Sequence, residues 1–365
     1  MRLSKAFSFG WMILAATVGT MGCRTVPQVP AGPVFYPAPP DPPRIQYLHS
    51  FSTKRDVTTK YSWVEALVGP SEAELMGFIK PYGVAVTRGK LYVCDTMGRT
   101  VWVVDFVEGT FQTLAGDRRQ GKLRLPINLA IDSDGRKYVA DAERGQIVVY
   151  GPNDEYLIAF GAGENLKPTD VAIAGDRLIV ADLNKPEIQI RDKQTGKLIR
   201  GLGSPETASL EESVGQPANV AVDAQGTILV SDIGRTKILL FAMDGTFLGS
   251  FGQAGKQMGQ FIRPKGIAVD RTGRIYVVDA AFENVQIFDD QHRLLMWFGA
   301  PPGDEGTLVL PAGMAIDYDN VDYFRKYVAP GYDIEYLIWV VSQGARGWVG
   351  CYGLLKAPGT TTAQK

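Results

Sequence analysis

Three oxygen-bearing side chains recur at one position of a repeated motif in this chain. The position lies two residues after a recurrent proline and reads, in chain order, Gly83, Asn128, Asp170, Asn219, Gly266 and Gly313. Hard cations such as calcium prefer carboxylate and amide oxygens as ligands. If the fold brings consecutive repeats together, Asn128, Asp170 and Asn219 could hold a calcium ion. They could instead hydrogen-bond the turn that leads into each strand.

The repeated motif itself predicts short strands. A proline is followed by two residues, an apolar-Ala-apolar triplet, a turn, and a strand that ends in Val-x-Asp. Six copies begin at Pro81, Pro126, Pro168, Pro217, Pro264 and Pro311. They are roughly 40–50 residues apart, which is typical of a four-stranded propeller blade. The copies resemble the NHL-repeat family, and the resemblance implies an all-β, six-bladed β-propeller over residues 44–356.

Two further features of the repeat predict structural roles. The last copy has no fourth strand of its own, whereas residues 45–51 resemble the fourth strands of the other copies. We therefore expect residues 44–51 to complete the last blade and close the ring. The aspartates that end the second strands recur too regularly to be catalytic, and we expect them to cap turns.

The first 43 residues predict export and a lipid anchor. Arg2 and Lys5 precede an apolar run, and small residues lead to Gly22-Cys23, which resembles the lipobox of bacterial lipoproteins. We expect a signal peptide over residues 1–22, lipidation at Cys23 and a stiff, proline-rich tether over residues 23–43. By resemblance to Gram-negative sorting signals, Arg24 favours the outer membrane, on either its periplasmic or its outer face. Residues 357–365 are expected to form a disordered tail.

Few residues are suited to catalysis. The two histidines, His49 and His292, fall in different repeats, so neither a zinc site nor a Ser-His dyad is expected. Cys94 and Cys351 lie in repeats that a closed ring makes neighbours, and a disulfide between them is one reading. The other repeats carry Ala, Ser or Val at the position of Cys94, which favours a small buried residue.

Two other groups of side chains suggest binding surfaces. Loops on the predicted channel-mouth face carry Arg99, Arg144, Lys185, Arg235 and Arg346. These cations form a basic rim for an acidic partner, unless they pair with neighbouring aspartates. An insertion over residues 318–336 of the last repeat is rich in aromatic residues, among them Tyr323, Phe324, Tyr327 and Tyr332. Such density is typical of protein interfaces, although the loop could instead plug the channel.

The expected function is a non-catalytic binding or scaffold lipoprotein of the bacterial cell envelope, with an envelope protein or extracellular polymer as partner. A net charge of -1 and export give no reason to expect nucleic acid, and the membrane is contacted through the lipid anchor only. The alternative is a calcium-dependent hydrolase or lactonase acting at the channel mouth. No catalytic residue can be assigned, and calcium is the one cofactor considered.

Overall fold

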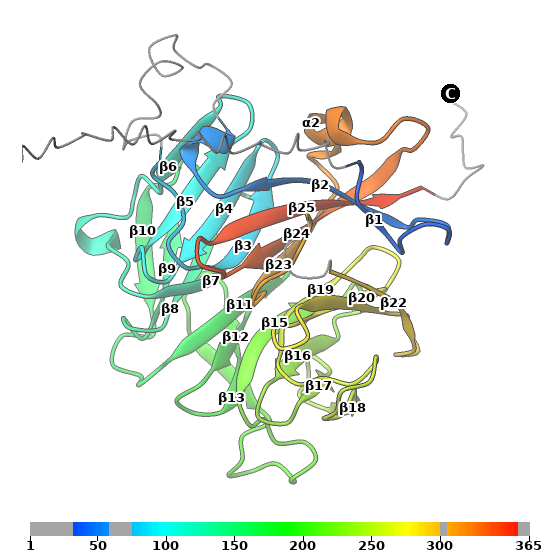
Figure 1. The fold of residues 1–365 in the computed structure, drawn as a ribbon. Helices are drawn as coiled ribbons and strands as arrows, with labels where there is room; N and C mark the ends of the chain where they lie inside the picture. The colour runs from blue at the N-terminus through cyan, green and yellow to red at the C-terminus, as the bar shows by residue number, and fades with distance from the viewer. Residues whose placement is uncertain (1–31, 58–74, 300–304, 357–365) are drawn as a thin grey trace, which may run out of the picture. The chain divides into compact units, whose positions relative to one another are not determined.

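Short antiparallel strands joined by tight turns form the protein (Figure 1). A computed structural model describes residues 32–57, 75–299 and 305–356. The predicted signal peptide, Cys23 and the predicted C-terminal tail lie outside these ranges. Among the described residues, no helix has the length and apolar character needed to cross a membrane.

Five of the six blades are four-stranded sheets built from consecutive strands. Blade 1 contains β3 (Pro81–Thr87), β4 (Lys90–Asp95), β5 (Thr100–Asp105) and β6 (Thr110–Thr113). Blade 2 contains β7 (Pro126–Ile131), β8 (Lys137–Asp141), β9 (Gln146–Tyr150) and β10 (Tyr156–Phe160). Blade 3 contains β11 (Pro168–Ala174), β12 (Arg177–Asp182), β13 (Glu187–Asp192) and β14 (Leu198–Leu202). Blade 4 contains β15 (Pro217–Val222), β16 (Ile228–Asp232), β17 (Lys237–Phe241) and β18 (Phe247–Phe251). Blade 5 contains β19 (Pro264–Val269), β20 (Ile275–Asp279), β21 (Asn284–Phe288) and β22 (Leu294–Phe298).

Blade 6 joins the two ends of the described chain. Its strands lie in the order β1 (Phe35–Tyr36), β2 (Ile45–Phe51), β25 (Trp348–Leu355), β24 (Ile334–Ser342) and β23 (Met314–Asp317). Strand β2 pairs with β25, with Ile45 opposite Leu354 and Phe51 opposite Val349. Figure 1 shows this blue strand beside the red one. The prediction that residues 44–51 close the ring is confirmed, and the fold is an all-β, six-bladed β-propeller.

The end of the predicted tether is part of this sheet, which differs from the expectation for residues 33–43. Phe35 and Tyr36 pair with β2. Tyr36 is 8% exposed, and its hydroxyl donates to the carbonyl oxygen of Gly306 at 3.1 Å. Burial of a large aromatic ring with a satisfied hydroxyl stabilises this edge despite the surrounding prolines.

The middle strands of each blade form the core. Leu178, Ile179, Val180 and Ala181 in β12 are all 0% exposed, because neighbouring blades cover both faces of the sheet. Fourth strands are half-solvated, so Leu198 in β14 is exposed. Short helical turns interrupt the strands at η1 (Lys54–Asp56), η2 (Arg119–Gly121), α2 (Val321–Phe324) and η3 (Arg325–Tyr327).

The recurrent aspartates cap turns, as predicted. Asp95 accepts hydrogen bonds from the backbone N–H groups of Ile79, Lys80 and Gly98, at 2.6, 2.9 and 2.8 Å. The same pattern recurs at Asp141 and Asp232. Cys94 and Cys351 are buried free thiols. The alternative of a disulfide between them is therefore wrong, and the interpretation of Cys94 as a small buried residue is confirmed.

Adjacent blades touch where the innermost strands begin. A Cβ added to Gly83 would lie 2.2 Å from Asn128 Oδ1, and one added to Gly313 would lie 2.4 Å from the carbonyl oxygen of Tyr82. The N–H of Gly313 donates to that carbonyl at 2.8 Å. Glycine is therefore required here by close approach of backbones. This contact ring positions the polar residues at the centre of the propeller.

Candidate functional site

Asp170 links blades 3 and 4 at the start of their innermost strands. The side chain is 3% exposed. Its Oδ2 accepts from Asn219 Nδ2 at 3.0 Å and from the N–H of Val220 at 2.9 Å. Its Oδ1 accepts from the N–H of Val171 at 2.8 Å. Asp170 and Asn219 thus meet across blades, as the repeat position suggests.

Desolvation dominates the electrostatics of this carboxyl. Burial raises the pKa of Asp170 to about 7, although the donors from Val220, Val171, Asn219 and Asn128 favour the charged form and oppose the shift. A carboxyl with this pKa is partly protonated at neutral pH.

Calcium takes about 6–8 oxygen ligands. The cluster offers one carboxylate, and both of its oxygens already accept N–H groups. The Asn219 side chain turns its nitrogen toward Asp170, and its buried Oδ1 has no hydrogen-bond partner among the described residues. That part of the chain holds no group of three acidic, histidine or cysteine side chains arranged for a metal. This donor set suits a hydrogen-bonded bridge between blades and offers too few free oxygens for calcium. Calcium binding itself has not been measured and stays a prediction.

Lys265 is a central residue that the sequence pattern did not single out. It follows the anchor proline of blade 5 and is 6% exposed. Its ammonium lies 4.9 Å from the centre of the Tyr82 ring. The sequence does contain a signal for this residue, because Lys265 is the one charged residue at its position in the repeat. The other copies carry Tyr82, Ile127, Thr169, Ala218 and Ala312.

The five cations of the predicted basic rim divide into two groups. Arg99 lies 3.6 Å from a carboxylate oxygen of Glu143. Arg144 donates to the carbonyl oxygens of Gln120 and Lys122, and Arg235 to the hydroxyl of Ser213. Within the described residues, Lys185 and Arg346 are exposed and form no ion pair. Of the five, Arg99 alone is paired with a carboxylate in the described part of the chain, so the prediction of an acidic partner at this rim depends on the other four cations.

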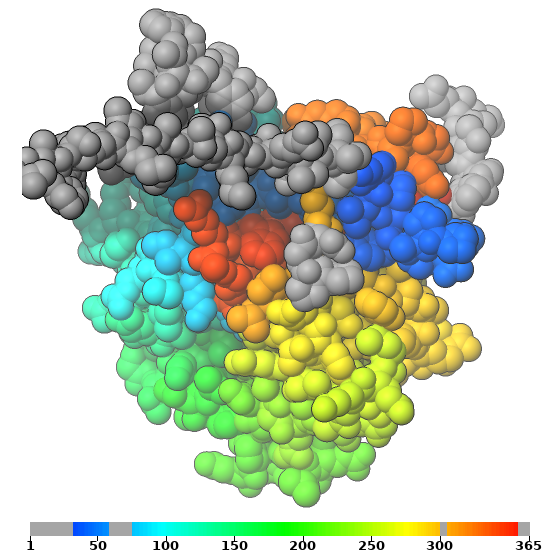
Figure 2. Space-filling view, viewed as in Figure 1, coloured from blue at the N-terminus to red at the C-terminus, as the bar shows by residue number. Residues whose placement is uncertain are grey.

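The aromatic insertion is fastened to two blades. Asn320 is 0% exposed; its Nδ2 donates to the carbonyl oxygen of Thr87 at 2.9 Å, and its Oδ1 accepts from the N–H of Gly89 at 2.6 Å. Gln46 in β2 donates to the carbonyl oxygen of Tyr327 at 2.8 Å and accepts from the N–H of Ala329 at 3.0 Å. Figure 2 shows the orange insertion beside the blue N-terminal residues. The loop therefore bridges blade 6 and blade 1.

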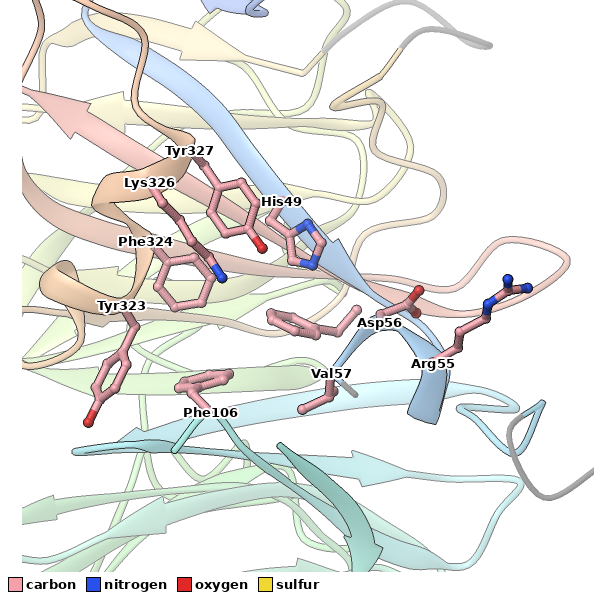
Figure 3. A pocket seen from close by; sticks show the side chains of 10 residues that line it. His49, Arg55, Asp56, Val57, Phe106, Tyr323, Phe324, Lys326 and Tyr327 are labelled. Atoms are coloured by element: carbon pink, nitrogen blue, oxygen red, sulfur yellow. The ribbon is translucent and has the colours of Figure 1, made fainter. Parts of the chain in front are cut away.

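A cavity of about 550 Å³ opens at this junction, between β2, η1, the turn after β5 and the insertion (Figure 3). We call it the seam cleft. The imidazole of His49 stacks on Tyr327 with 4.8 Å between ring centres, and Phe324 packs edge-on against Phe106 at 5.3 Å. Tyr323, 36% exposed, forms an outer wall. Tyr332, the fourth predicted aromatic, packs on Phe35 instead, at 5.0 Å.

Charged groups surround the aromatic walls of the seam cleft. The ammonium of Lys326 lies 4.9 Å from the centre of the Tyr327 ring, and Arg55 lies at the other end (Figure 3). The carboxylate of Asp56 accepts the N–H groups of Ser52 and Thr53, so it is engaged by the backbone. Burial lowers the pKa of His49, which keeps its imidazole neutral at pH 7. The sequence predicted the aromatic residues of the insertion but not the cleft, because His49, Arg55 and Phe106 lie far from the insertion in the chain.

Comparisons with known proteins agree with the fold. No family model matches the chain. Protein brain tumor of Drosophila melanogaster is 32% identical over 89 residues, which is 24% of this chain and 8% of that protein. The match thus spans a small part of that relative.

Several solved structures share the architecture at low sequence identity. A protein of unknown function from Bacteroides thetaiotaomicron has a TM-score of 0.58 and 16% identity, covering 76% of this chain and 70% of that one. An auxiliary nutrient binding protein from the same organism has a TM-score of 0.55 and 11% identity, with 76% and 70% covered. Virginiamycin B lyase from Staphylococcus aureus has a TM-score of 0.51 and 12% identity, with 76% and 95% covered. Such identities establish the propeller class and no activity.

Proposed function

We propose that this protein is a non-catalytic binding lipoprotein of the bacterial cell envelope, which presents the seam cleft to a segment of a partner protein. The observation that carries the proposal is the cleft itself. An insertion absent from the other five repeats is fixed by Asn320 and Gln46 so that aromatic rings face an open cavity of about 550 Å³. In protein recognition, clefts with aromatic walls commonly receive an anchor residue of the partner.

The chemistry of the cleft indicates its partner. The rings of Tyr323, Phe324 and Tyr327 offer apolar and stacking surface, while Lys326 supplies positive charge. The neutral His49 adds no charge, and the negative charge of Asp56, which the N–H groups of Ser52 and Thr53 hold in place, lies at the opposite end of the cleft from Lys326. An acidic segment with one aromatic or large apolar anchor residue complements this surface. The NHL-type repeats support this use, since a rigid propeller with variable loops suits binding.

Site-specific photocrosslinking in the native envelope tests the proposal. A photoreactive phenylalanine derivative at Tyr323 is expected to give a discrete adduct with one envelope protein. The matched control is the same probe at Leu157, an exposed apolar residue of blade 2, 44% exposed. The Lys326→Glu change should abolish the Tyr323 adduct by reversing the charge. Equal adducts at both positions, or an adduct that survives Lys326→Glu, would count against a specific cleft.

The lipid anchor is a separate part of the proposal. We infer lipidation at Cys23, export by residues 1–22, an outer-membrane location, and a tether that ends before β1. Two or more acyl chains anchor a protein firmly, at about 0.8 kcal/mol per buried methylene. Metabolic labelling with a fatty-acid analogue should mark the wild type and not Cys23→Ala. Label on both proteins, or on neither, would refute the anchor while leaving the seam cleft untouched.

A further inference from the structure

Lys265 is a cation buried at the centre of the ring. Its ammonium faces the ring of Tyr82 at 4.9 Å and the Oε1 atom of Gln343 at 3.5 Å. The second distance is at the limit of a hydrogen bond. Neither contact carries a negative charge, so the ammonium is poorly compensated by these neighbours.

Two other cationic side chains are buried among the described residues, and both have a carboxylate partner. Lys137 lies 2.6 Å from Asp154 Oδ1 and also donates to the carbonyl oxygens of Gly151 and Pro152. Arg191 forms an ion pair with Glu164. Lys265 has no such pair in the described part of the chain. A buried charge is strongly destabilising unless it is paired. Lys265 is therefore the one buried cation of the described residues that no carboxylate neutralises.

Three blades converge on this ammonium. Lys265 belongs to blade 5 and Tyr82 to blade 1, and the intervening blade 6 carries the small Ala312 and Gly313 at the equivalent positions. Lys265 can therefore reach across blade 6. Gln343 follows β24, and its Nε2 donates to the carbonyl oxygen of Pro81 at 3.0 Å, which turns its oxygen toward the lysine.

Other positively charged side chains lie near the ammonium of Lys265. Burial lowers the pKa of Lys265 to about 8, and nearby Arg263 and Lys80 add to this shift. Burial, and then Asp170, raises the pKa of Tyr82, so its phenol stays protonated and can donate.

We propose that Lys265 and Tyr82, with Gln343 orienting the ammonium, form a binding site for one carboxylate group. One oxygen accepts from the ammonium and the other from the phenol. A single negative charge matches a single lysine, whereas phosphate carries up to about two charges and favours more donors. The carboxylate comes from a free organic acid or from an acidic side chain of a partner. This site is independent of the seam cleft.

Calorimetric titration of the full chain at constant ionic strength tests the site. The probes are succinate for a free acid, hexaglutamate for an acidic side chain, and inorganic phosphate for comparison. One carboxylate probe should bind once per chain. Lys265→Met should weaken it about 30-fold or more, and Tyr82→Phe about fivefold. The control Lys197→Met removes an exposed lysine in the turn between β13 and β14, outside the rim and the seam cleft, and should leave binding unchanged.

Each outcome decides the proposal. Binding of succinate supports a free acid, and binding of hexaglutamate alone supports an acidic side chain. Binding that is equal in wild type and Lys265→Met, restricted to phosphate, or absent for both carboxylate probes overturns the site. Affinity should also fall as pH rises above about 8, because the amine loses its proton. Asp170 titrates near pH 7, so Asp170→Asn separates its effect from that of Lys265.

Discussion

Replacing Lys265 by Met should stabilise the unliganded protein. Methionine has a similar length and no charge, so the variant removes the unpaired buried ammonium and keeps its packing against Tyr82. Most substitutions of buried residues are destabilising. A gain in stability is expected here because a binding residue without its ligand is held in an unfavourable state.

The size and sign of the gain follow from the pKa of Lys265. Burial lowers it from 10.5 to about 8, which corresponds to about 3 kcal/mol at neutral pH. Loss of the contact with the Tyr82 ring offsets roughly 1 kcal/mol, leaving about 2 kcal/mol. Between pH 8 and 10.5 the unfolded chain binds more protons than the native state, so the stability of the wild type rises with pH. The advantage of Lys265→Met should therefore be largest below pH 8 and shrink toward pH 10.

Urea unfolding followed by tryptophan fluorescence at pH 7 and pH 10 measures this difference. Comparing two proteins at one pH cancels the other titrating groups. The matched control is Lys137→Met, which strands Asp154 and should lose about 3–5 kcal/mol at pH 7. A Lys265→Met variant that is less stable than wild type at pH 7, or a difference that is equal at both pH values, would refute the reasoning.

Three further predictions concern the ring. Deleting residues 45–51 should leave β25 unpaired and prevent folding, seen as loss of soluble protein; a soluble variant with an unchanged melting temperature would contradict ring closure. Because the pKa of Asp170 is raised from 3.8 to about 7, its contribution to stability falls as pH rises through that window. Asp170→Asn should remove roughly 4 kcal/mol of this pH dependence in urea unfolding, and an unchanged slope would exclude the effect. Elemental analysis and titration should find no calcium held by the mouth cluster, whereas one calcium lost in Asp170→Ala would revive the hydrolase alternative.

The fold could be predicted because each repeat carries its own local signals. The prolines, the paired strands and the Val-x-Asp caps recur, and the caps make the same backbone contacts in blades 1, 2 and 4. Ring closure followed from one missing strand at the end and one spare strand at the start. The small strand at Phe35–Tyr36 was not predictable from a proline-rich composition, since a single buried tyrosine decides it.

The candidate sites were harder to predict because they depend on contacts between blades. The position of Asp170 in the repeat suggested a ligand, but one of its oxygens accepts N–H groups of the next blade and the other accepts the N–H of Val171, which one sequence cannot reveal. The seam cleft combines residues from β2, η1, blade 1 and the insertion. Residue types alone gave the aromatic loop but not the cavity that it completes.

Asp170 and Lys265 are buried charges of opposite sign near one axis, and they do not compensate each other. Burial and hydrogen bonds are the main causes of the shifted pKa of Asp170, while burial, Arg263 and Lys80 shift that of Lys265. Neither residue is among the groups that shift the other. Asp170 is satisfied locally by N–H donors from two blades. Lys265 has no equivalent acceptors in the described chain, which is why the proposed site assigns its counter-charge to a bound carboxylate.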